Sequence, residues 1–135
     1  MEEYIKNIDL QTVSMQTLAF IGDSVYDLYI RCYLASHSNE KAGILHKRAI
    51  HYVSAKSQAK IIDEISYILS DEEIAIYKRG RNTNITTSKH AEVVEYKKAT
   101  GFEALIGYLY ITKKIDRLEE IIKLCIKIGG GENGK

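Results

Sequence analysis

The chain has 135 residues, of which 45% are hydrophobic and 27% are charged, and its formal net charge is +1. These values are typical of one globular domain that buries its own core, and they exclude long-range disorder and a chain that is basic throughout. No apolar run is long enough to span a bilayer, and no apolar leader region follows the acidic start. Because Cys32 and Cys125 lack metal-ligand spacing, we expect both to be buried in a reduced, cytoplasmic protein without a membrane partner.

The residue pattern predicts an all-α fold, since no proline interrupts the chain and no segment alternates with period two. Ser14, Ser54 and Ser70 are placed to cap helices, and Asp116 with Glu119 forms a further capping-box pattern. Predicted helices cover about 15–35, 40–52, 55–69, 71–79, a stretch from between 91 and 99 to 113, and 117–128. Residues 81–90 are predicted to form a loop, because they are rich in Asn, Thr and Ser.

We expect one domain over residues 1–128, followed by a flexible Gly-rich tail over 129–135. The first long helix of this domain has two apolar faces. One stripe, predicted to face the core, consists of Leu18, Ile21, Val25, Leu28 and Cys32. The other side carries Ala19, Phe20, Ile30 and Leu34. A helix that is apolar on both sides is buried on both sides, so the second face would meet another helix or a second subunit.

Asp23 lies among these apolar residues, where a carboxylate is costly unless it is protonated, paired or bound to a metal. Gly22 beside it removes a side chain in mid-helix, which indicates close approach by another group. Glu103 sits at the edge of a second apolar stripe, with Gly107 one turn further on. A structural ion pair for Asp23 and a solvated flank for Glu103 are the alternatives. Two carboxylates that converge suit Mg²⁺, which commonly takes one or two protein carboxylates.

Two motifs resemble the ribonuclease III family. They are Leu18-Ala19-Phe20-Ile21-Gly22-Asp23-Ser24-Val25 and Phe102-Glu103-Ala104-Leu105-Ile106-Gly107. Between them Lys47-Arg48-Ala49 and Tyr77-Lys78-Arg79-Gly80-Arg81-Asn82 follow in the order of that family, and the resemblance covers roughly 12–115. The chain is most similar to the short Mini-ribonuclease III branch, so we expect no separate domain for binding double-stranded RNA.

The resemblance implies a homodimeric helical bundle that cuts double-stranded RNA with Mg²⁺, for which Mn²⁺ is a substitute. Asp23 and Glu103 would be the catalytic, metal-binding acids, and Phe20 would lie at the dimer interface. Longer members carry acids where this chain has Ala19 and Thr100.

The same resemblance implies products with 5′-phosphate and 3′-hydroxyl ends and short 3′ overhangs. The implied substrate is a stem in the precursor of large-subunit (23S) ribosomal RNA, with a ribosomal protein as a possible helper. Asp27, Glu92 and Glu95 are candidate helper acids.

Positive charge is concentrated locally, because residues 78–98 hold six Lys or Arg against two Glu. Side chains of these types contact the phosphates and sugars of nucleic acids. The candidate RNA-binding residues are Lys78, Arg79, Arg81, Asn82, Ser88, Lys89 and His90. The alternative is a solvated helix end whose cations complement the helix dipole. His46, Lys47 and Arg48 form a smaller candidate patch.

Two other functions remain open at this point. The chain could be a non-catalytic helical dimer that binds structured RNA, having lost two acids of the family. It could also be a helical protein-interaction domain without an RNA partner. Mg²⁺-dependent cleavage of a duplex separates the first from an enzyme, and the salt dependence of RNA binding tests the second.

Overall fold

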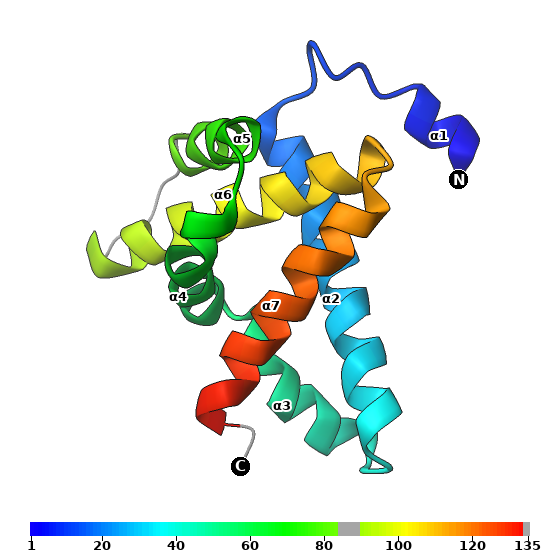
Figure 1. The fold of residues 1–135 in the computed structure, drawn as a ribbon, viewed down its shortest axis with the longest axis vertical. Coiled ribbons are helices and arrows are strands. Elements are labelled where there is room, and N and C mark those ends of the chain that lie inside the picture. Colours follow the sequence, from blue (N-terminus) through cyan, green and yellow to red (C-terminus); the bar gives the residue numbers. More distant parts are fainter. Residues whose placement is uncertain (84–89, 134–135) are drawn as a thin grey trace.

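The computed structural model describes residues 1–83 and 90–133, and within this part of the chain every regular element is a helix (Figure 1). The predicted all-α class is therefore confirmed. The elements are α1 (Glu2–Lys6), α2 (Met15–His37), α3 (Ala42–Val53), α4 (Ala55–Ile65), the 3₁₀ turn η1 (Ser66–Ile68), α5 (Asp71–Arg81), α6 (His90–Ile111) and α7 (Ile115–Asn133). Among the described residues, none of the helices has both the length and the apolar character that crossing a membrane requires.

The predicted serine caps are confirmed, because each serine hydroxyl accepts a hydrogen bond from a backbone N–H three residues ahead. Ser14 accepts from Thr17 at 3.0 Å, and Ser54 caps α4 in the same way at 3.1 Å. Ser70 and Glu73 form a complete capping box at the start of α5, since the Glu73 carboxylate also accepts from the Ser70 N–H at 2.8 Å.

The capping box predicted at Asp116 and Glu119 is wrong. Helix α7 begins at Ile115, two residues before the predicted start, so Asp116 lies inside its first turn. The Glu119 carboxylate accepts a hydrogen bond from the Tyr29 hydroxyl of α2 at 2.8 Å. Glu119 thus ties α7 to α2 instead of closing its own helix end.

Two helices continue past glycines that were predicted to end them, because each glycine lies in a tight tertiary contact. A Cβ at Gly80 in α5 would lie 2.9 Å from the Cα of Gly101. A Cβ at Gly129 in α7 would lie 2.6 Å from the Tyr52 ring, and the helix runs on to Asn133. Long-range packing therefore overrides the local preference of glycine for a helix end.

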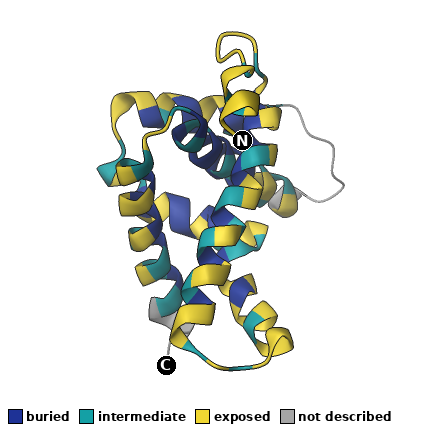
Figure 2. Cartoon of the chain, turned by 90° about the vertical axis from the view of Figure 1, so that its right-hand side faces the viewer, coloured by how far each residue is buried: buried dark blue, intermediate teal, exposed yellow. Residues whose placement is uncertain are grey.

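The core surrounds α6, which crosses α2 and is also contacted by α4, α5 and α7 (Figure 1). Buried residues lie on the sides of the helices that face one another, and exposed residues lie on their outer sides (Figure 2). The stripe predicted for α6 is confirmed, and its members are fully buried: Phe102, Leu105, Ile106 and Leu109. Tyr26 of α2 packs edge-on against Phe102, with ring centroids 4.9 Å apart.

The predicted core face of α2 is partly wrong. Leu28 is 62% exposed and Cys32 is exposed, whereas Cys125 of α7 is buried as expected. The buried residues of α2 share only Leu18 with the predicted stripe, and they are Met15, Leu18, Ala19, Gly22, Tyr26, Ile30 and Leu34. Because α2 is apolar on both sides, its periodicity alone does not determine which side α6 covers.

A pair of glycines sets the distance between α2 and α6. A Cβ at Gly22 would lie 1.8 Å from the carbonyl oxygen of Glu103, and a Cβ at Gly107 would lie 2.0 Å from that of Leu18. Real Cβ atoms do not approach other atoms so closely. The two helices can therefore cross at this distance only because both positions lack a side chain.

We predict that Gly22→Ala lowers the free energy of unfolding by about 2–3 kcal/mol, because the added methyl group forces two packed backbones apart. Urea unfolding followed by circular dichroism measures this change. Gly43→Ala in α3 is the matched control: no atom lies within 4 Å of its Cβ position, so it should gain about 0.5–1 kcal/mol from helix propensity. Equal effects of the two substitutions would contradict this account of the crossing.

Candidate active site

The helix crossing brings Asp23 and Glu103 together. Asp23 directly follows Gly22 on α2, and the backbone of Glu103 is the group that Gly22 faces on α6. The two carboxyl groups interact, since the negative charge and the hydrogen bonding of Asp23 both raise the pKa of Glu103. The structure therefore brings together the two acids that the sequence analysis singled out 80 positions apart in the chain.

The two acids line an open hollow of about 240 Å³, which we call the acidic hollow. Its walls come from two helices. The residues that line the hollow are Gln16, Ala19, Phe20 and Asp23 of α2 and Tyr96, Thr100 and Glu103 of α6. Ala19 and Thr100, the two positions at which the resemblance implies acids in longer proteins, thus face the same space but offer no charge.

The burial of the two acids differs from the prediction, in which Asp23 was the acid surrounded by apolar residues. Asp23 is exposed to solvent, and Glu103 is the half-buried member of the pair. Burial, followed by the negative charge and the hydrogen bond of Asp23, raises the pKa of Glu103 from its usual 4.5 to about 8. The Gln58 amide acts in the opposite direction by hydrogen bonding to the Glu103 carboxyl. Without a cation, Glu103 therefore holds a proton at neutral pH.

This electrostatic arrangement fits a divalent cation. Two carboxylates that repel each other in a half-buried site ionise together only when a positive charge compensates them. Asp23 and Glu103 supply the hard oxygen ligands that Mg²⁺ prefers, and the open hollow leaves space for its remaining water ligands. In the described part of the chain, no group of three or more His, Cys, Asp or Glu side chains is arranged to hold a metal.

The candidate helper acids lie outside the residues that line the acidic hollow. The Asp27 carboxylate pairs with the Arg31 guanidinium of the next turn at 2.9 Å. Glu92 and Glu95 lie on α6 before Tyr96, and Glu92 is exposed while Glu95 is half-buried. None of the three joins the pair formed by Asp23 and Glu103.

The predicted RNA-binding residues that the structure describes gather at the end of α5. Lys78 and Arg79 are exposed in its last turn, and Asn82 is the exposed residue that follows it. The Arg81 guanidinium lies over the Tyr77 ring, 5.6 Å from its centroid. Since Gly80 of α5 packs on Gly101 of α6, the basic end of α5 crosses α6 two residues before Glu103.

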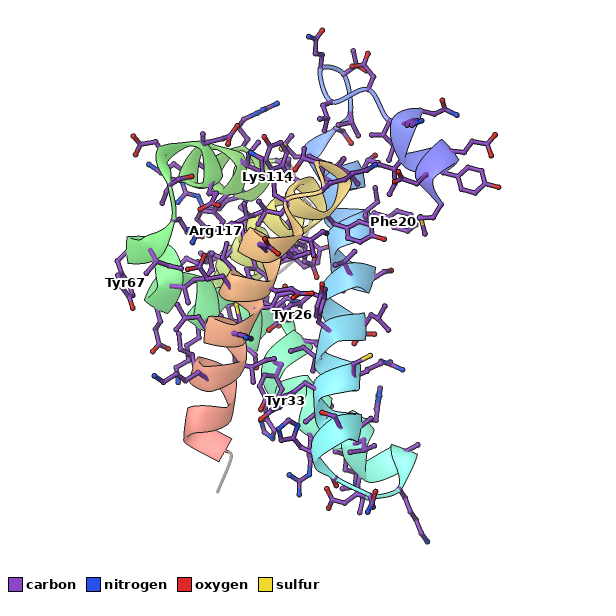
Figure 3. All side chains as sticks on the ribbon, turned by 45° about the vertical axis from the view of Figure 1, so that its right-hand side comes forward. Phe20, Tyr26, Tyr33, Tyr67, Lys114 and Arg117 are labelled. Carbon is purple, nitrogen blue, oxygen red and sulfur yellow. The ribbon has the colours of Figure 1, made fainter. Side chains whose placement is uncertain are left out.

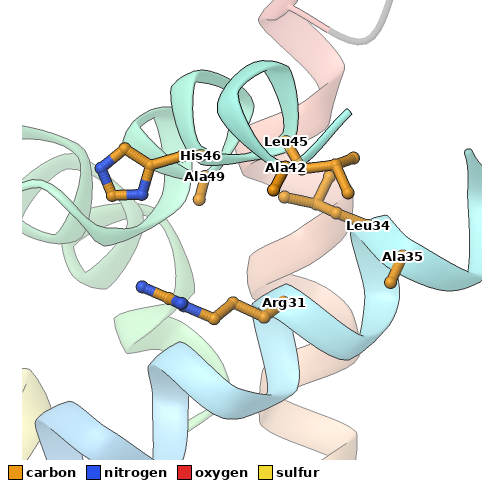
Figure 4. A pocket seen from close by; sticks show the side chains of 7 residues that line it. All are labelled: Arg31, Leu34, Ala35, Ala42, Leu45, His46 and Ala49. Atoms are coloured by element: carbon orange, nitrogen blue, oxygen red, sulfur yellow. The ribbon is translucent and has the colours of Figure 1, made fainter. Parts of the chain in front are cut away.

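Some of the predicted contacts lie outside the described residues: Ser88, Lys89 and the side chain of His90. In the smaller basic patch, the Arg48 guanidinium is paired with Glu40 at 2.7 Å. His46 lines a separate hollow of about 200 Å³ between α2 and α3, together with Arg31 and apolar side chains (Figure 4). No acid lines this second hollow, so it offers no metal ligands comparable to those of the acidic hollow.

Phe20 is 79% exposed and points away from α2 on the side of the N-terminal helix (Figure 3). It lines the acidic hollow, and it also lines an apolar groove of about 660 Å³. The groove consists of Met1, Tyr4, Ile5, Ile8, Phe20, Ile21, Ser24, Val25, Leu28, Tyr29, Cys32, Tyr110 and Ile111. The apolar face of α2 that α6 leaves uncovered is thus a continuous surface beside the acids.

Gln58 of α4 was not predicted from the sequence as a residue of the site, but it is only 1% exposed and its hydrogen bonding lowers the pKa of Glu103. A signal for it exists in the sequence. Gln58 precedes Ile61, Ile62 and Ile65 at helical spacing, so it lies on the buried stripe of its helix. A glutamine at such a position requires buried hydrogen-bond partners.

Comparison with known protein families gives a match that covers most of the chain. The Ribonuclease III domain family matches residues 16–114, which include both acidic motifs. The chain therefore belongs to the ribonuclease III family.

Within that family the chain is similar to proteins named Mini-ribonuclease 3. It is 45% identical to one from Enterococcus faecalis, over 94% of this chain and 98% of the relative. It is 46% identical to one from Clostridium tetani, over 94% and 85% of the two chains. A crystal structure of a protein from Fusobacterium nucleatum superposes with a TM-score of 0.81 at 35% identity, covering 92% of this chain and 96% of that one.

The raised pKa of Glu103 makes the stability of the metal-free protein depend on pH. Between about pH 5 and 8 the folded state keeps a proton that the unfolded chain releases, so the free energy of unfolding falls as the pH rises. One such proton gives a slope of up to about 1.4 kcal/mol per pH unit. Urea unfolding in EDTA should show this slope in the wild type and a shallower one in Glu103→Gln. Equal slopes would remove Glu103 as its source.

Proposed function

We propose that this protein is an endoribonuclease that hydrolyses phosphodiester bonds in double-stranded RNA. The observation that carries the proposal is the contact between the carboxyl groups of Asp23 and Glu103 in an open hollow. Membership of the ribonuclease III family and the names of the relatives support it. The raised pKa of Glu103 adds support, because strongly perturbed acids in clefts are characteristic of functional sites.

In this proposal Asp23 and Glu103 hold Mg²⁺, and Mn²⁺ can take its place. When bound, the cation supplies activation of water for attack on phosphorus and compensation of the charge that develops on the phosphate. Asp23 meets the solution first, because it is exposed while Glu103 lies deeper. Glu103 would have to be ionised to hold the cation. Ala19 and Thr100 leave the hollow with only two acids, which favours a single firmly held ion.

The basic end of α5 is the proposed contact for the RNA backbone. Lys78 and Arg79 are exposed there, close to where α5 crosses α6. Duplex RNA is recognised mainly by shape, through phosphates and 2′-hydroxyls, so little sequence preference is expected from these residues. The family resemblance further suggests a stem in the large-subunit (23S) ribosomal RNA precursor as substrate, and cuts that leave 5′-phosphate and 3′-hydroxyl ends.

The apolar groove is the proposed interface of a homodimer. An exposed apolar surface of this extent is rare on monomers and marks interaction sites. Its most exposed large side chains, Met1, Tyr4, Phe20 and Leu28, are between 62% and 79% exposed. A two-fold axis through this surface would relate two acidic hollows, one for each strand of a duplex.

The first test is the variant Asp23→Asn, which removes one ligand charge but keeps the shape of the side chain. We expect Mg²⁺-dependent cleavage of a labelled RNA duplex to fall by at least about 10³-fold, because the remaining Glu103 cannot compensate a divalent ion alone. Gel analysis measures cleavage, and circular dichroism checks the fold. Asp9→Asn, the same substitution at an exposed position, is the control and should retain activity.

The alternative of a non-catalytic RNA-binding dimer makes a different prediction for the same samples. The wild type would bind the duplex, with an affinity that falls steeply as salt rises, but would not cleave it at any Mg²⁺ concentration. Full cleavage by Asp23→Asn would instead exclude Asp23 from the mechanism. Absence of salt-sensitive binding would favour a protein-interaction domain.

The dimer is tested by Phe20→Ser, with Tyr67→Ser as a matched control. Both aromatic rings are 79% exposed, but they lie on opposite sides of the molecule (Figure 3). We expect Phe20→Ser to raise the dimer dissociation constant by about 30-fold or more, since aromatic anchors at interfaces typically contribute about 2 kcal/mol or more. Analytical ultracentrifugation measures the constant. Identical behaviour of the two variants would contradict an interface at Phe20.

A further inference from the structure

A third helix reaches the acidic pair through Gln58 of α4. Its side chain is 1% exposed, and its amide nitrogen donates to the Val53 carbonyl at 3.1 Å. Hydrogen bonding by the same amide also lowers the pKa of the Glu103 carboxyl, so the two side chains lie close together. Its oxygen, Oε1, is buried without a hydrogen-bond partner. Gln58 is thus anchored by backbone at one point and directed at Glu103 from a different helix than Asp23.

The bond to the Val53 carbonyl accounts for the amide nitrogen, but stability of the core does not explain a buried amide oxygen at this position. A buried polar atom left without a partner costs about 1–3 kcal/mol, and an apolar side chain of the same length would avoid that cost. The neighbours of Gln58 on the buried face of α4 are isoleucines, Ile61, Ile62 and Ile65. Methionine would continue this apolar stripe. The amide therefore provides something that the packing alone does not require.

Glu103 is the group that needs the amide. A carboxylate that accepts an N–H hydrogen bond keeps one orientation and is stabilised in its ionised form, which is the form that binds a cation. Asp23 alone does the opposite, because its negative charge disfavours ionisation of Glu103. The Val53 carbonyl fixes the amide in turn, so the backbone before α4 determines where the donor lies.

We propose that Gln58 is a positioning residue, which orients the ionised Glu103 carboxylate for a divalent cation without touching the cation itself. This inference rests on the proposed function of the acidic pair. Hydrogen bonds that support metal ligands typically change metal affinity by 10–100-fold when they are removed. The expected consequence of losing Gln58 is therefore weaker metal binding in a protein that remains folded.

The test compares Gln58→Met with the wild type in the absence of RNA. Calorimetric titration with Mn²⁺ should show an apparent dissociation constant about 10–100-fold higher for Gln58→Met. Its thermal midpoint without metal should change little, because loss of the bond to Val53 opposes removal of the unpaired oxygen. Cleavage of duplex RNA should recover as Mg²⁺ is raised, in contrast to Asp23→Asn. Gln11→Met, at an exposed position before α2, is the control and should bind Mn²⁺ as the wild type does.

The outcomes separate the two levels of the proposal. A wild type that binds neither Mn²⁺ nor Mg²⁺ would refute the proposed function of the acidic pair. A wild type that binds, together with unchanged affinity in Gln58→Met, would overturn only the role of Gln58.

A measurement on the wild type covers the case in which Gln58→Met does not fold. The chain has three glutamines, Gln11, Gln16 and Gln58, so their side-chain amide signals in ¹⁵N NMR spectra can be distinguished by substituting the other two. The Gln58 signal should shift as Mg²⁺ saturates the site. A signal that stays in place at saturation would overturn the inference.

Discussion

The close crossing of α2 and α6 is the constraint on which the rest of the structure depends. Gly22 and Gly107 each lie where a side chain would collide with the backbone of the other helix. A glycine inside a helix costs about 1 kcal/mol relative to alanine, so two such positions weaken the isolated helices. The crossing compensates for this cost by burying the side chains of both helices at their contact. It also sets the distance between the two acids, because Asp23 directly follows Gly22 and Glu103 lies one helical turn before Gly107.

The unfavourable features of the molecule concentrate around that crossing. Glu103 is half-buried beside a second negative charge, and Gln58 carries a buried oxygen without a partner. Each feature lowers the stability of the folded chain when no cation is bound. The buried hydroxyl of Tyr26, one turn after Gly22, also lacks a partner, whereas the Ser70–Glu73 capping box and its bond to Arg117 are fully paired. Local costs that collect at one place are the expected mark of a functional site, because binding rather than folding relieves them.

The two apolar faces of α2 have different surroundings. The face with Gly22 and Tyr26 packs on α6 and forms the core. The face with Leu28 lies open in the apolar groove, and Phe20 lies where this groove meets the acidic hollow. If a second copy of the chain covers the groove, as proposed, its contact with Phe20 is only three residues from Asp23. Assembly and metal binding would then depend on the same stretch of one helix.

The sequence by itself determined the helical class, the serine caps of three helices and the pair of acids beside glycines. Each of these depends on short-range information: a cap involves residues three apart, and a helical stripe repeats within one segment. Only the tertiary structure decided which face of α2 is buried, where α5 and α7 end, that Asp23 is exposed while Glu103 is half-buried, and that Gln58 reaches the site. These features depend on which distant helix covers a given surface. A two-sided apolar helix, or a glycine that fits either a helix end or a close contact, is locally compatible with more than one answer.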